Sequence, residues 1–462
     1  MIPQRAVENA QPEVHIQRKP SDRVYAAIHW TCMAIIGAIL LNGLLISRWW
    51  PMPRPVGFRV FVFMLLTFNV LWWSIADRRI ARHIASARLA RWLRWGIVGF
   101  CGALNLPIFY GLVVGRVPPL VSNPTWYTAA VTLWHVALPM ALPLVASVRL
   151  AALGAQALAR RTFTEPTAAS VRENEVFDPT RRALLKTAFA SVPVAMLAGG
   201  TAWGRWQIGG FNVHRHALAA PWLPDRLKGL TITQVSDLHV GRLYRPDMLA
   251  HLVEQVNGLK SDIIVVTGDV VDSSNQMLPP AIDALGQFTS RHGTYLCMGN
   301  HDEFDDRLEF IRAVRERLPL LINERRTLEI GGERLTLAGV DYANEPEPTR
   351  RRAGDIANVA ETLKGHDAQS DGPVIALAHH PHTWDILQLH GVPLTLSGHT
   401  HGGQIMMTPP GGVDLGLGRA LFRYIRGFYR TDESTLFVNS GVGNWFPIRI
   451  NAPAEIVQIQ LV

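Results

Sequence analysis

The stretch Ser397-Gly398-His399-Thr400-His401-Gly402-Gly403 follows a short apolar run and carries two histidines one residue apart, bracketed by glycines. The apolar run predicts a strand, and the small neighbours leave room for a ligand at its end. By itself the pair is ambiguous, because such histidines can simply be exposed in a polar turn. Four other apolar runs in the same half of the chain also end in residues that can bind metal ions, which favours a site.

Residues 205–462 alternate apolar runs with amphipathic stretches, and this alternation predicts an α/β domain. We predict strands at Leu230–Val235, Ile263–Val266, Thr294–Met298, Arg334–Ala338, Val374–Ala378 and Leu394–Leu396. We predict helices at Pro246–Leu259, Pro280–Phe288 and Asp305–Leu318. Strands separated by helices are typical of a layered fold in which helices flank central β-sheets.

Five of these strands run directly into polar residues of the types that bind metals. In chain order, the strand ends carry Asp237 and His239; Asp269 and Asp272; Asn300, His301 and Asp302; His379 and His380; and His399 and His401. Each pair alone has an ordinary explanation as a turn or a helix cap. Because ligands of α/β sheets bind beyond the carboxyl ends of the strands, the five together predict one convergent metal site.

Mixed carboxylate, imidazole and amide ligands favour Mn, Fe or Zn. The candidate ligands exceed what one ion needs, so we expect two divalent metal ions about 3.5–4 Å apart with a bridging carboxylate. Such a pair converts water into hydroxide near neutral pH and stabilises charge on a phosphoryl group. The pattern therefore predicts a hydrolase acting on a phosphoester or pyrophosphate bond.

The set Asp-x-His, Gly-Asp-x-x-Asp, Gly-Asn-His-Asp, His and Gly-His-x-His resembles the calcineurin-like metallophosphoesterase superfamily, over residues 223–462. Residues 236–241 and 397–404 are similar to its membrane-associated branch, which includes enzymes acting on lipid-linked phosphates and UDP-diacylglucosamine. Residues 439–443 and 447–449 also resemble this branch, although Pro453-Ala454-Glu455 replaces its usual Pro-Pro-Glu.

The resemblance implies a role for each motif residue. One ion would be held by Asp237, His239 and His401, and the other by Asn300, His379 and His399, with Asp269 bridging. It implies that His301 is the catalytic acid or stabilises the transition state, and that Asp272 and Asp302 orient the ligands. His380 is the alternative to His379. Residues 408–429 are expected to form a hairpin near the site, or to contact a lipid surface.

The first half of the chain is dominated by apolar segments. After a polar tail at residues 1–20, four segments in residues 21–155 approach the roughly 20 residues that cross a membrane: Val24–Ile46, Val56–Ala76, Trp95–Val114 and Trp126–Ala152. Tryptophans lie at many of their ends, as in the aromatic belt of membrane proteins. We therefore expect four transmembrane helices, with a buried helical bundle as the alternative.

A linker at residues 156–182 ends in Thr180-Arg181-Arg182-Ala183-Leu184-Leu185-Lys186, which resembles a twin-arginine export signal. Residues 183–204 would then form a fifth helix or signal anchor; a basic flank on an ordinary membrane helix is the alternative. The net charge is +8, but arginines gather at segment ends, as a membrane topology requires, so no nucleic-acid partner is expected. The three cysteines do not indicate a compartment.

These observations predict a multi-pass protein of the bacterial inner membrane, with residues 205–462 on the periplasmic side. Its expected partners are the lipid bilayer, a phosphorylated lipid-linked substrate and the twin-arginine translocation machinery. Two alternatives remain open. One is a cytoplasmic enzyme similar to UDP-diacylglucosamine pyrophosphatases, and the other is a non-catalytic membrane scaffold or transport protein whose phosphoesterase-like domain only binds a ligand.

Overall fold

The computed structural model describes residues 56–84, 86–114, 126–135, 151, 154, 194–241, 243–345, 347–407, 415–416, 418–419 and 422–462. The chain divides into two units, Met1–Ile108 with Ala137–Ala190 and Phe109–Val136 with Ser191–Val462. The arginine pair Arg181 and Arg182 and the predicted segment Val24–Ile46 lie outside the described residues.

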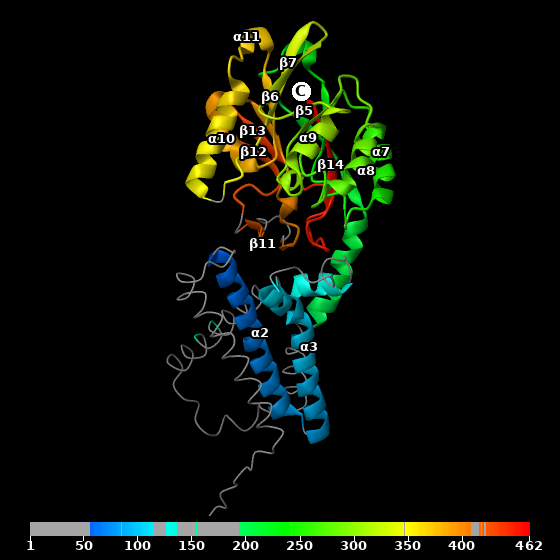
Figure 1. Cartoon of the computed structure of the whole chain (residues 1–462), viewed down its shortest axis with the longest axis vertical. Coiled ribbons are helices and arrows are strands. Elements are labelled where there is room, and N and C mark those ends of the chain that lie inside the picture. Colours follow the sequence, from blue (N-terminus) through cyan, green and yellow to red (C-terminus); the bar gives the residue numbers. More distant parts are fainter. Residues whose placement is uncertain are drawn as a thin grey trace, which may run out of the picture. The chain divides into compact units, whose positions relative to one another are not determined.

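Two long helices carry two of the predicted apolar segments (Figure 1): α2 (Val56–His83) and α3 (Ala87–Val114). Polar contacts join them, because Asn105 Nδ2 donates to Asn69 Oδ1 at 3.1 Å and Arg94 Nε donates to Asp77 Oδ1 at 2.6 Å. Among the described residues, no helix combines the length and the apolar character that a membrane crossing needs.

The second unit contains an α/β domain, residues 211–462, built on two six-stranded sheets. The first sheet has the order β1-β14-β2-β3-β4-β5. Its strands β2, β3, β4 and β5 are parallel, β14 is antiparallel to β2, and β1 is parallel to β14. The strands are β1 (Phe211–Leu218), β2 (Thr231–Val235), β3 (Ile263–Thr267), β4 (Thr294–Cys297), β5 (Leu320–Leu321) and β14 (Ala454–Leu461).

The second sheet has the order β12-β13-β9-β8-β7-β6. Four parallel strands, β13, β9, β8 and β7, form its centre, and antiparallel strands β12 and β6 close its edges. The strands are β6 (Glu324–Ile330), β7 (Glu333–Val340), β8 (Val374–Ala378), β9 (Leu394–Ser397), β12 (Gly427–Arg430) and β13 (Thr435–Val438).

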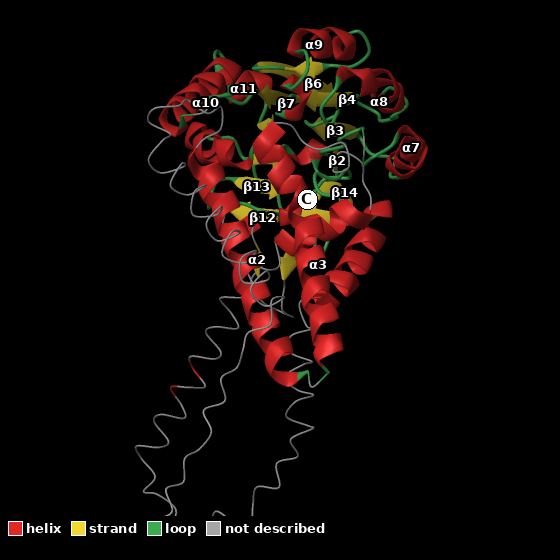
Figure 2. Cartoon of the chain, turned by 60° about the horizontal axis from the view of Figure 1, so that its bottom comes forward, coloured by secondary structure: helices red, strands yellow, loops and turns green. Residues whose placement is uncertain are grey.

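The two sheets pack face to face and helices cover their outer faces, as Figure 2 shows. Between the sheets lies a core to which both contribute, including Ile263, Val265, Leu377 and Leu396. Against the outer face of the first sheet pack α7 (Leu249–Gly258), α8 (Leu278–Leu285) and α9 (Arg307–Arg315), and against the second pack α10 (Pro348–Leu363) and α12 (Trp384–Leu387). The predicted layered α/β fold is confirmed.

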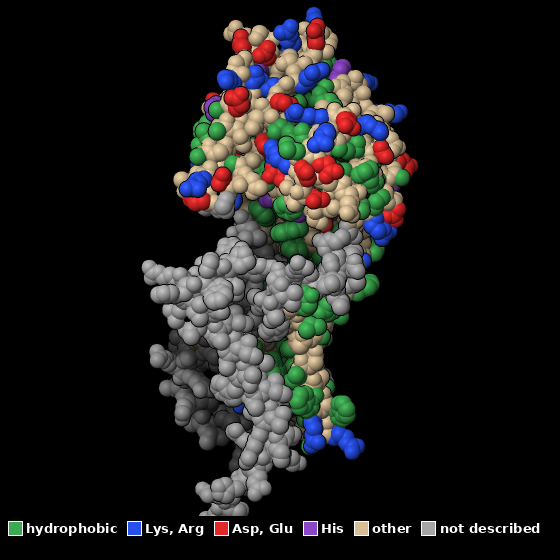
Figure 3. Space-filling view, viewed as in Figure 1, with side chains coloured by type: hydrophobic (Ala, Val, Ile, Leu, Met, Phe, Trp, Pro, Cys, Tyr) green, Lys and Arg blue, Asp and Glu red, His purple; other side chains and the backbone are tan. Residues whose placement is uncertain are grey.

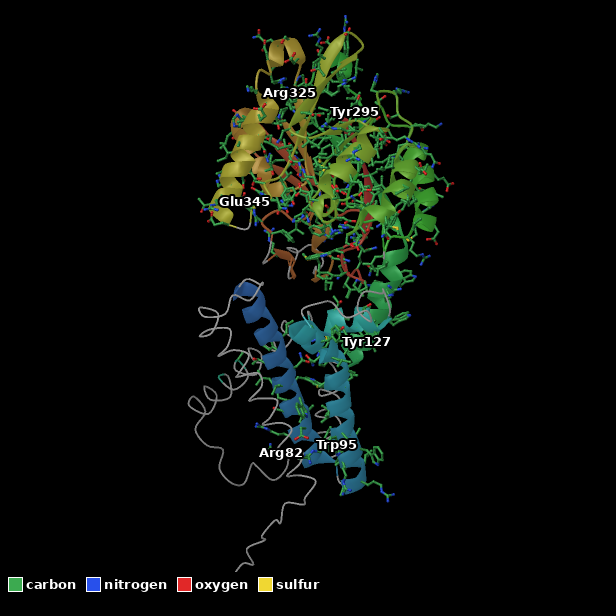
Figure 4. All side chains as sticks on the ribbon, viewed as in Figure 1. Arg82, Trp95, Tyr127, Tyr295, Arg325 and Glu345 are labelled. Carbon is green, nitrogen blue, oxygen red and sulfur yellow. The ribbon has the colours of Figure 1, made fainter. Side chains whose placement is uncertain are left out.

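Each predicted strand and helix of the domain is present, with ends shifted by a few residues. Several elements were not predicted: β1, β6, β12, β13, β14 and α10. Arg325, labelled in Figure 4, belongs to β6 and donates to the carbonyl oxygens of Thr362 and Lys364 at the end of α10. These bonds pair carbonyl groups that the helix itself leaves open.

Residues 194–206 are helical and overlap the predicted fifth segment. The helix joins the α/β domain directly, because Gly204 O accepts from Arg449 N at 3.0 Å. A Cβ atom at Gly204 would lie 3.0 Å from Ile448 Cβ, so the glycine permits this close approach. The helix end is therefore part of the packing of the domain.

A substitution in α9 tests the outer core of the first sheet. Phe310 is fully buried, whereas Leu308, two residues earlier, is 70% exposed. We expect Phe310→Ala to lower the free energy of unfolding by about 3–5 kcal/mol through the cavity it leaves. Leu308→Ala is the matched control and should change it by less than about 0.5 kcal/mol. Urea unfolding followed by circular dichroism measures both, and equal losses would contradict this packing.

Candidate metal centre

The candidate metal ligands come from the loops that follow β2, β3, β4, β8 and β9. These loops meet at one end of the domain, where the carboxyl ends of the two sheets' parallel strands face each other. Four groups of side chains lie close enough to hold an ion: Asp237, His239 and His401; Asp237, Asp269 and His379; His379, His380 and His399; and His239, Asp272 and His301. The predicted convergence is therefore present.

Five of the site residues adopt left-handed backbone conformations without being glycine. The φ angles are 51° at Asp237, 46° at His239, 54° at Asp269, 73° at His399 and 50° at His401. Such conformations cost of order 1–2 kcal/mol for an L-residue. Strained backbone of this kind persists where the surrounding structure over-determines it, as at functional sites.

At the first candidate position, imidazole nitrogens face carboxylate oxygens at close range. His239 Nε2 lies 2.9 Å from His401 Nε2 and 3.3 Å from Asp269 Oδ2. His401 Nε2 lies 3.6 Å from Asp237 Oδ1. At 2.9 Å the two ring nitrogens can share at most one proton. If neither carries a proton, their lone pairs face each other, and a cation bound by both nitrogens would remove that repulsion.

The second candidate position is arranged around Asn300. His379 Nε2 lies 3.1 Å from Asn300 Oδ1 and 3.2 Å from Asp269 Oδ2. The other ring nitrogen of His379 is 2.7 Å from Thr267 O. That carbonyl can only accept, so in the neutral ring Nε2 carries a lone pair facing two oxygens. Asp269 thus reaches both candidate positions, as a bridging carboxylate must.

These separations fit a metal centre. Two ligand atoms at about 2.1 Å from one ion lie about 3.0–3.4 Å apart when they subtend 90–109°. The nitrogen and oxygen pairs described above are 2.9 to 3.6 Å apart. Carboxylate, imidazole and amide donors are also the set that Mn, Fe and Zn accept. The residues present therefore fit divalent metal ions.

Residues 230–403 match the family model described as calcineurin-like phosphoesterase. This stretch contains all ten predicted site residues. The domain is therefore similar to the calcineurin-like metallophosphoesterases. Its family and its candidate ligands are those of a phosphoesterase hydrolase. From here on, residues 211–462 are called the phosphoesterase domain.

Relatives share this domain across bacteria and animals. An uncharacterized metallophosphoesterase of Helicobacter pylori is 34% identical over 242 residues, which are 51% of this chain and 61% of that protein. A Danio rerio protein named a transmembrane protein with metallophosphoesterase domain is 32% identical over 252 residues, 52% of this chain and 54% of that protein. An uncharacterized metallophosphoesterase of Bacillus subtilis is 26% identical over 300 residues, 61% of this chain and 97% of that protein. The match thus spans less than two thirds of the first two relatives.

Asp302 connects the loops after β3 and β4 through hydrogen bonds to their backbone. Its fully buried carboxylate accepts backbone N–H groups from Asp269 at 3.0 Å, Val270 at 2.8 Å, Val271 at 3.3 Å and Gly299 at 2.9 Å. The loops after β3 and β4 are therefore fixed to one side chain. The orienting role of Asp302 toward the metal ligands stays a prediction, and these hydrogen bonds are its structural basis.

His301 lies beside the first position, with its ring 4.4 Å from that of His239. Its Nδ1 hydrogen-bonds to the backbone carbonyl of Asp272, and its backbone N donates to Asp269 Oδ1 at 2.8 Å. Because the carbonyl takes the proton on Nδ1, Nε2 is the nitrogen that can face a substrate. The Asp272 side chain lies 3.8 Å from His239 Nδ1, on the side away from the other ligands.

Burial sets the charge of most site residues. It lowers the pKa of His239 to about 4 and that of His399 to about 3, so both rings are neutral, the form that binds a metal ion. Burial also raises the pKa of Asp237 to about 6. Burial opposes a charge on His379, but the Asp269 carboxylate outweighs it and raises the pKa of His379 to about 9. Without a metal ion, the Asp269 carboxylate thus favours the protonated form of His379.

Arg449 is a buried residue beside the site for which the motifs predicted no contact with a candidate ligand. Its guanidinium is fully buried and donates to Asn444 Oδ1 at 2.7 Å, Ala452 O at 2.8 Å and Gly443 O at 2.6 Å. It also lies 3.4 Å from His401 Nδ1. Burial lowers the pKa of Arg449 to about 10, which leaves it charged at neutral pH. The C-terminal loop therefore supports the candidate ligand His401. The sequence Pro453-Ala454-Glu455, which differs from the usual Pro-Pro-Glu, did not indicate this contact.

The structure brings together all ten predicted residues, Asp237, His239, Asp269, Asp272, Asn300, His301, Asp302, His379, His399 and His401; their individual roles stay predictions. His380, the alternative to His379, lies in the same cluster. The segment at residues 408–429 is described only in part. Within it, β11 (Leu415–Gly416) pairs with β10 (Met406–Met407), and the Phe422 ring lies 5.5 Å from that of His399.

Replacing Asp302 tests whether it holds the loops. In Asp302→Asn the amide turns N–H groups toward two backbone N–H groups in either orientation, and each buried donor left unpaired costs about 1–3 kcal/mol. We expect the free energy of unfolding to fall by at least about 2 kcal/mol. Asp283→Asn, at a side chain that is 64% exposed, is the control and should change little. Unchanged unfolding of Asp302→Asn in urea would refute the role.

Proposed function

We propose that the protein is a membrane-anchored, dinuclear metal-dependent phosphoesterase that hydrolyses a phosphoester or pyrophosphate bond of a lipid-linked substrate. The observation that carries the hydrolytic part is that Asp237, His239, Asp269, His379 and His401 form two adjoining buried groups of candidate ligands that share Asp237. Carboxylates clustered and buried in this way are costly without a compensating cation. A domain that only scaffolds or transports has no use for the complete set.

Two bound divalent ions would supply a strong nucleophile at neutral pH and neutralise charge on the phosphoryl group. The chain's own residues supply the rest. His301, with Nδ1 fixed to the carbonyl of Asp272, keeps Nε2 free to protonate the leaving oxygen or to stabilise charge there. Asp302 and Arg449 hold the loops that carry Asp269 and His401. The site is thereby pre-organised before a substrate binds.

The membrane part of the proposal rests on the first half of the chain. Its apolar segments and clustered arginines favour an anchor, and a Danio rerio relative is named a transmembrane protein. The twin-arginine-like stretch favours a periplasmic position of the phosphoesterase domain. A site held next to a bilayer favours substrates with a lipid portion, and the substrate is chosen on that ground alone.

The face of the phosphoesterase domain shown in Figure 3 does not favour nucleic acid as the substrate. Figure 3 shows basic and acidic side chains interspersed on the face of the phosphoesterase domain that it displays. A nucleic-acid backbone calls for a continuous basic tract. The second candidate function is a cytoplasmic enzyme similar to UDP-diacylglucosamine pyrophosphatases, which differs in the side of the membrane and not in the chemistry.

Removal of metal or of the bridging carboxylate tests the hydrolytic function. The full-length protein, purified in detergent, is assayed on bis-p-nitrophenyl phosphate with Mn²⁺ and after chelation. We expect chelation to abolish turnover and Asp269→Ala to lower kcat by about 100-fold or more. Asp225→Ala, at a side chain that is 90% exposed, is the control. Turnover that survives chelation, or full activity of Asp269→Ala, would sink the mechanism.

Protease accessibility tests the side of the membrane. An epitope tag after Val462 should be digested when protease is added to spheroplasts and protected in intact cells. Replacing Arg181 and Arg182 by Lys should leave the tag protected if a twin-arginine route is used, because the charge stays but the motif is lost. The adjacent pair Arg160 and Arg161, changed likewise, is the control. A tag protected in wild-type spheroplasts favours the cytoplasmic alternative.

A further inference from the structure

We propose that His380 is a third imidazole ligand at the second metal position, and that it makes this position select Zn²⁺ or Fe²⁺ over Mn²⁺. The inference rests on the proposed function, since it specifies one of the two metal positions of the same site. The motif pattern uses one histidine after β8, and His379 fills that role. His380 is the neighbouring histidine that the pattern leaves without a role.

The distances place His380 at the same meeting point as His379. His380 Nε2 lies 3.1 Å from Asn300 Oδ1, the distance that separates His379 Nε2 from the same oxygen. The rings of His380 and His399 are 4.0 Å apart, centroid to centroid. Candidate ligand atoms of His379, His380 and His399 all lie within 4.8 Å of one another. Two imidazoles, His379 and His380, therefore face the amide oxygen of Asn300, and the ligand atom of His399 lies close to both.

Apart from Asn300, the surroundings of His380 contact its ring mainly by packing. The residue is only 8% exposed, and its Nδ1 has no hydrogen-bond partner among the described residues. The ring is fixed by packing, with the Tyr342 ring at 4.6 Å and the His382 ring at 5.2 Å. Packing therefore holds His380 with its Nε2 turned toward Asn300, the side on which the second metal position lies.

The extra ligand makes the two positions chemically unequal. The first has two imidazoles, His239 and His401, beside carboxylates, whereas the second would have three imidazoles with Asn300 and Asp269. Nitrogen-rich sites bind Fe²⁺ and especially Zn²⁺ more tightly, while oxygen-rich sites suit Mn²⁺. We therefore expect the two positions to differ in metal preference.

A narrower role for His380 is to hold Asn300 by a hydrogen bond without touching the metal. The two roles predict different selectivities. Loss of a metal-binding nitrogen weakens Zn²⁺ more than Mn²⁺, whereas loss of support for Asn300 weakens both ions by the same factor. Selectivity, and not affinity alone, therefore separates them.

The test uses full-length protein stripped of metal and titrated with Zn²⁺, Mn²⁺ and Co²⁺. In His380→Gln we expect the affinity for Zn²⁺ at the nitrogen-rich position to fall about 10–100-fold, the affinity for Mn²⁺ to change by less than about threefold, and the Co²⁺ absorption of that position to change. His390→Gln is the matched control, because His390 is an exposed histidine in the short helical turn Gln388–His390 that follows α12. Equal losses for Zn²⁺ and Mn²⁺ with an unchanged Co²⁺ spectrum, or no loss at all, would overturn the proposal.

A measurement on the wild-type protein does not depend on the variant folding. With one equivalent of Zn²⁺, X-ray absorption at the zinc edge counts imidazole ligands, and we expect three; two would overturn the proposal. If the wild-type chain binds no divalent metal, the proposed function fails as well. If it binds two ions and hydrolyses the ester but shows two imidazoles, only the assignment of His380 fails.

Discussion

Four backbone N–H groups point at the carboxylate of Asp302, and the rest of the site depends on this arrangement. Burial raises the pKa of Asp302 to about 7, and the hydrogen bonds oppose that shift by stabilising the charged form. Because two of the donors, Asp269 N and Gly299 N, come from loops after different strands, one side chain fixes their separation. Asp269 and Asn300 are thereby held in place by the protein itself.

The loops also approach each other so closely that their sequence is restricted. A Cβ atom at Gly268 would lie 2.7 Å from Gly299 Cα and 2.8 Å from His379 Nδ1. Glycine at position 268, with φ of 81°, removes that conflict. The ligand-bearing neighbours such as Asp269 have no such freedom, and their left-handed backbone costs stability that the core between the two sheets must offset.

The sequence predicted the centre of the domain better than its edges. Continuous apolar runs such as Ile263–Val266 are typical of strands buried on both faces, and the polar residues after them identified the site. The pair of strands β1 and β14 was missed for two reasons. Phe211–Leu218 has no continuous apolar run, because it contains polar residues such as His214 and His216. Its partner strand, Ala454–Leu461, lies more than 200 residues away in the sequence. Helix α10 was missed because charged residues fill much of its first half.

The backbone conformations of the site could not be read from the sequence either. Left-handed φ angles are common at glycine and enriched at Asp and His, but residue type alone does not show that Asp237 and His401 adopt them. The role of Arg449 was hidden for a related reason. The Arg449 side chain is held by the backbone carbonyls of Gly443 and Ala452, which come together only in the folded loop.

Arg449 also links the site to the segment that enters the domain. Its guanidinium lies against His401, while its backbone N–H donates to Gly204 O at the end of the helix at residues 194–206. The side chain and the main chain of one buried residue thus bind a candidate metal ligand and the incoming helix at once. The glycine at position 204 lets the helix pack against Ile448 and Ile450 at van der Waals range. The incoming helix is therefore more than a tether, since its end belongs to the packing that holds Arg449, and through Arg449 the imidazole of His401, in place.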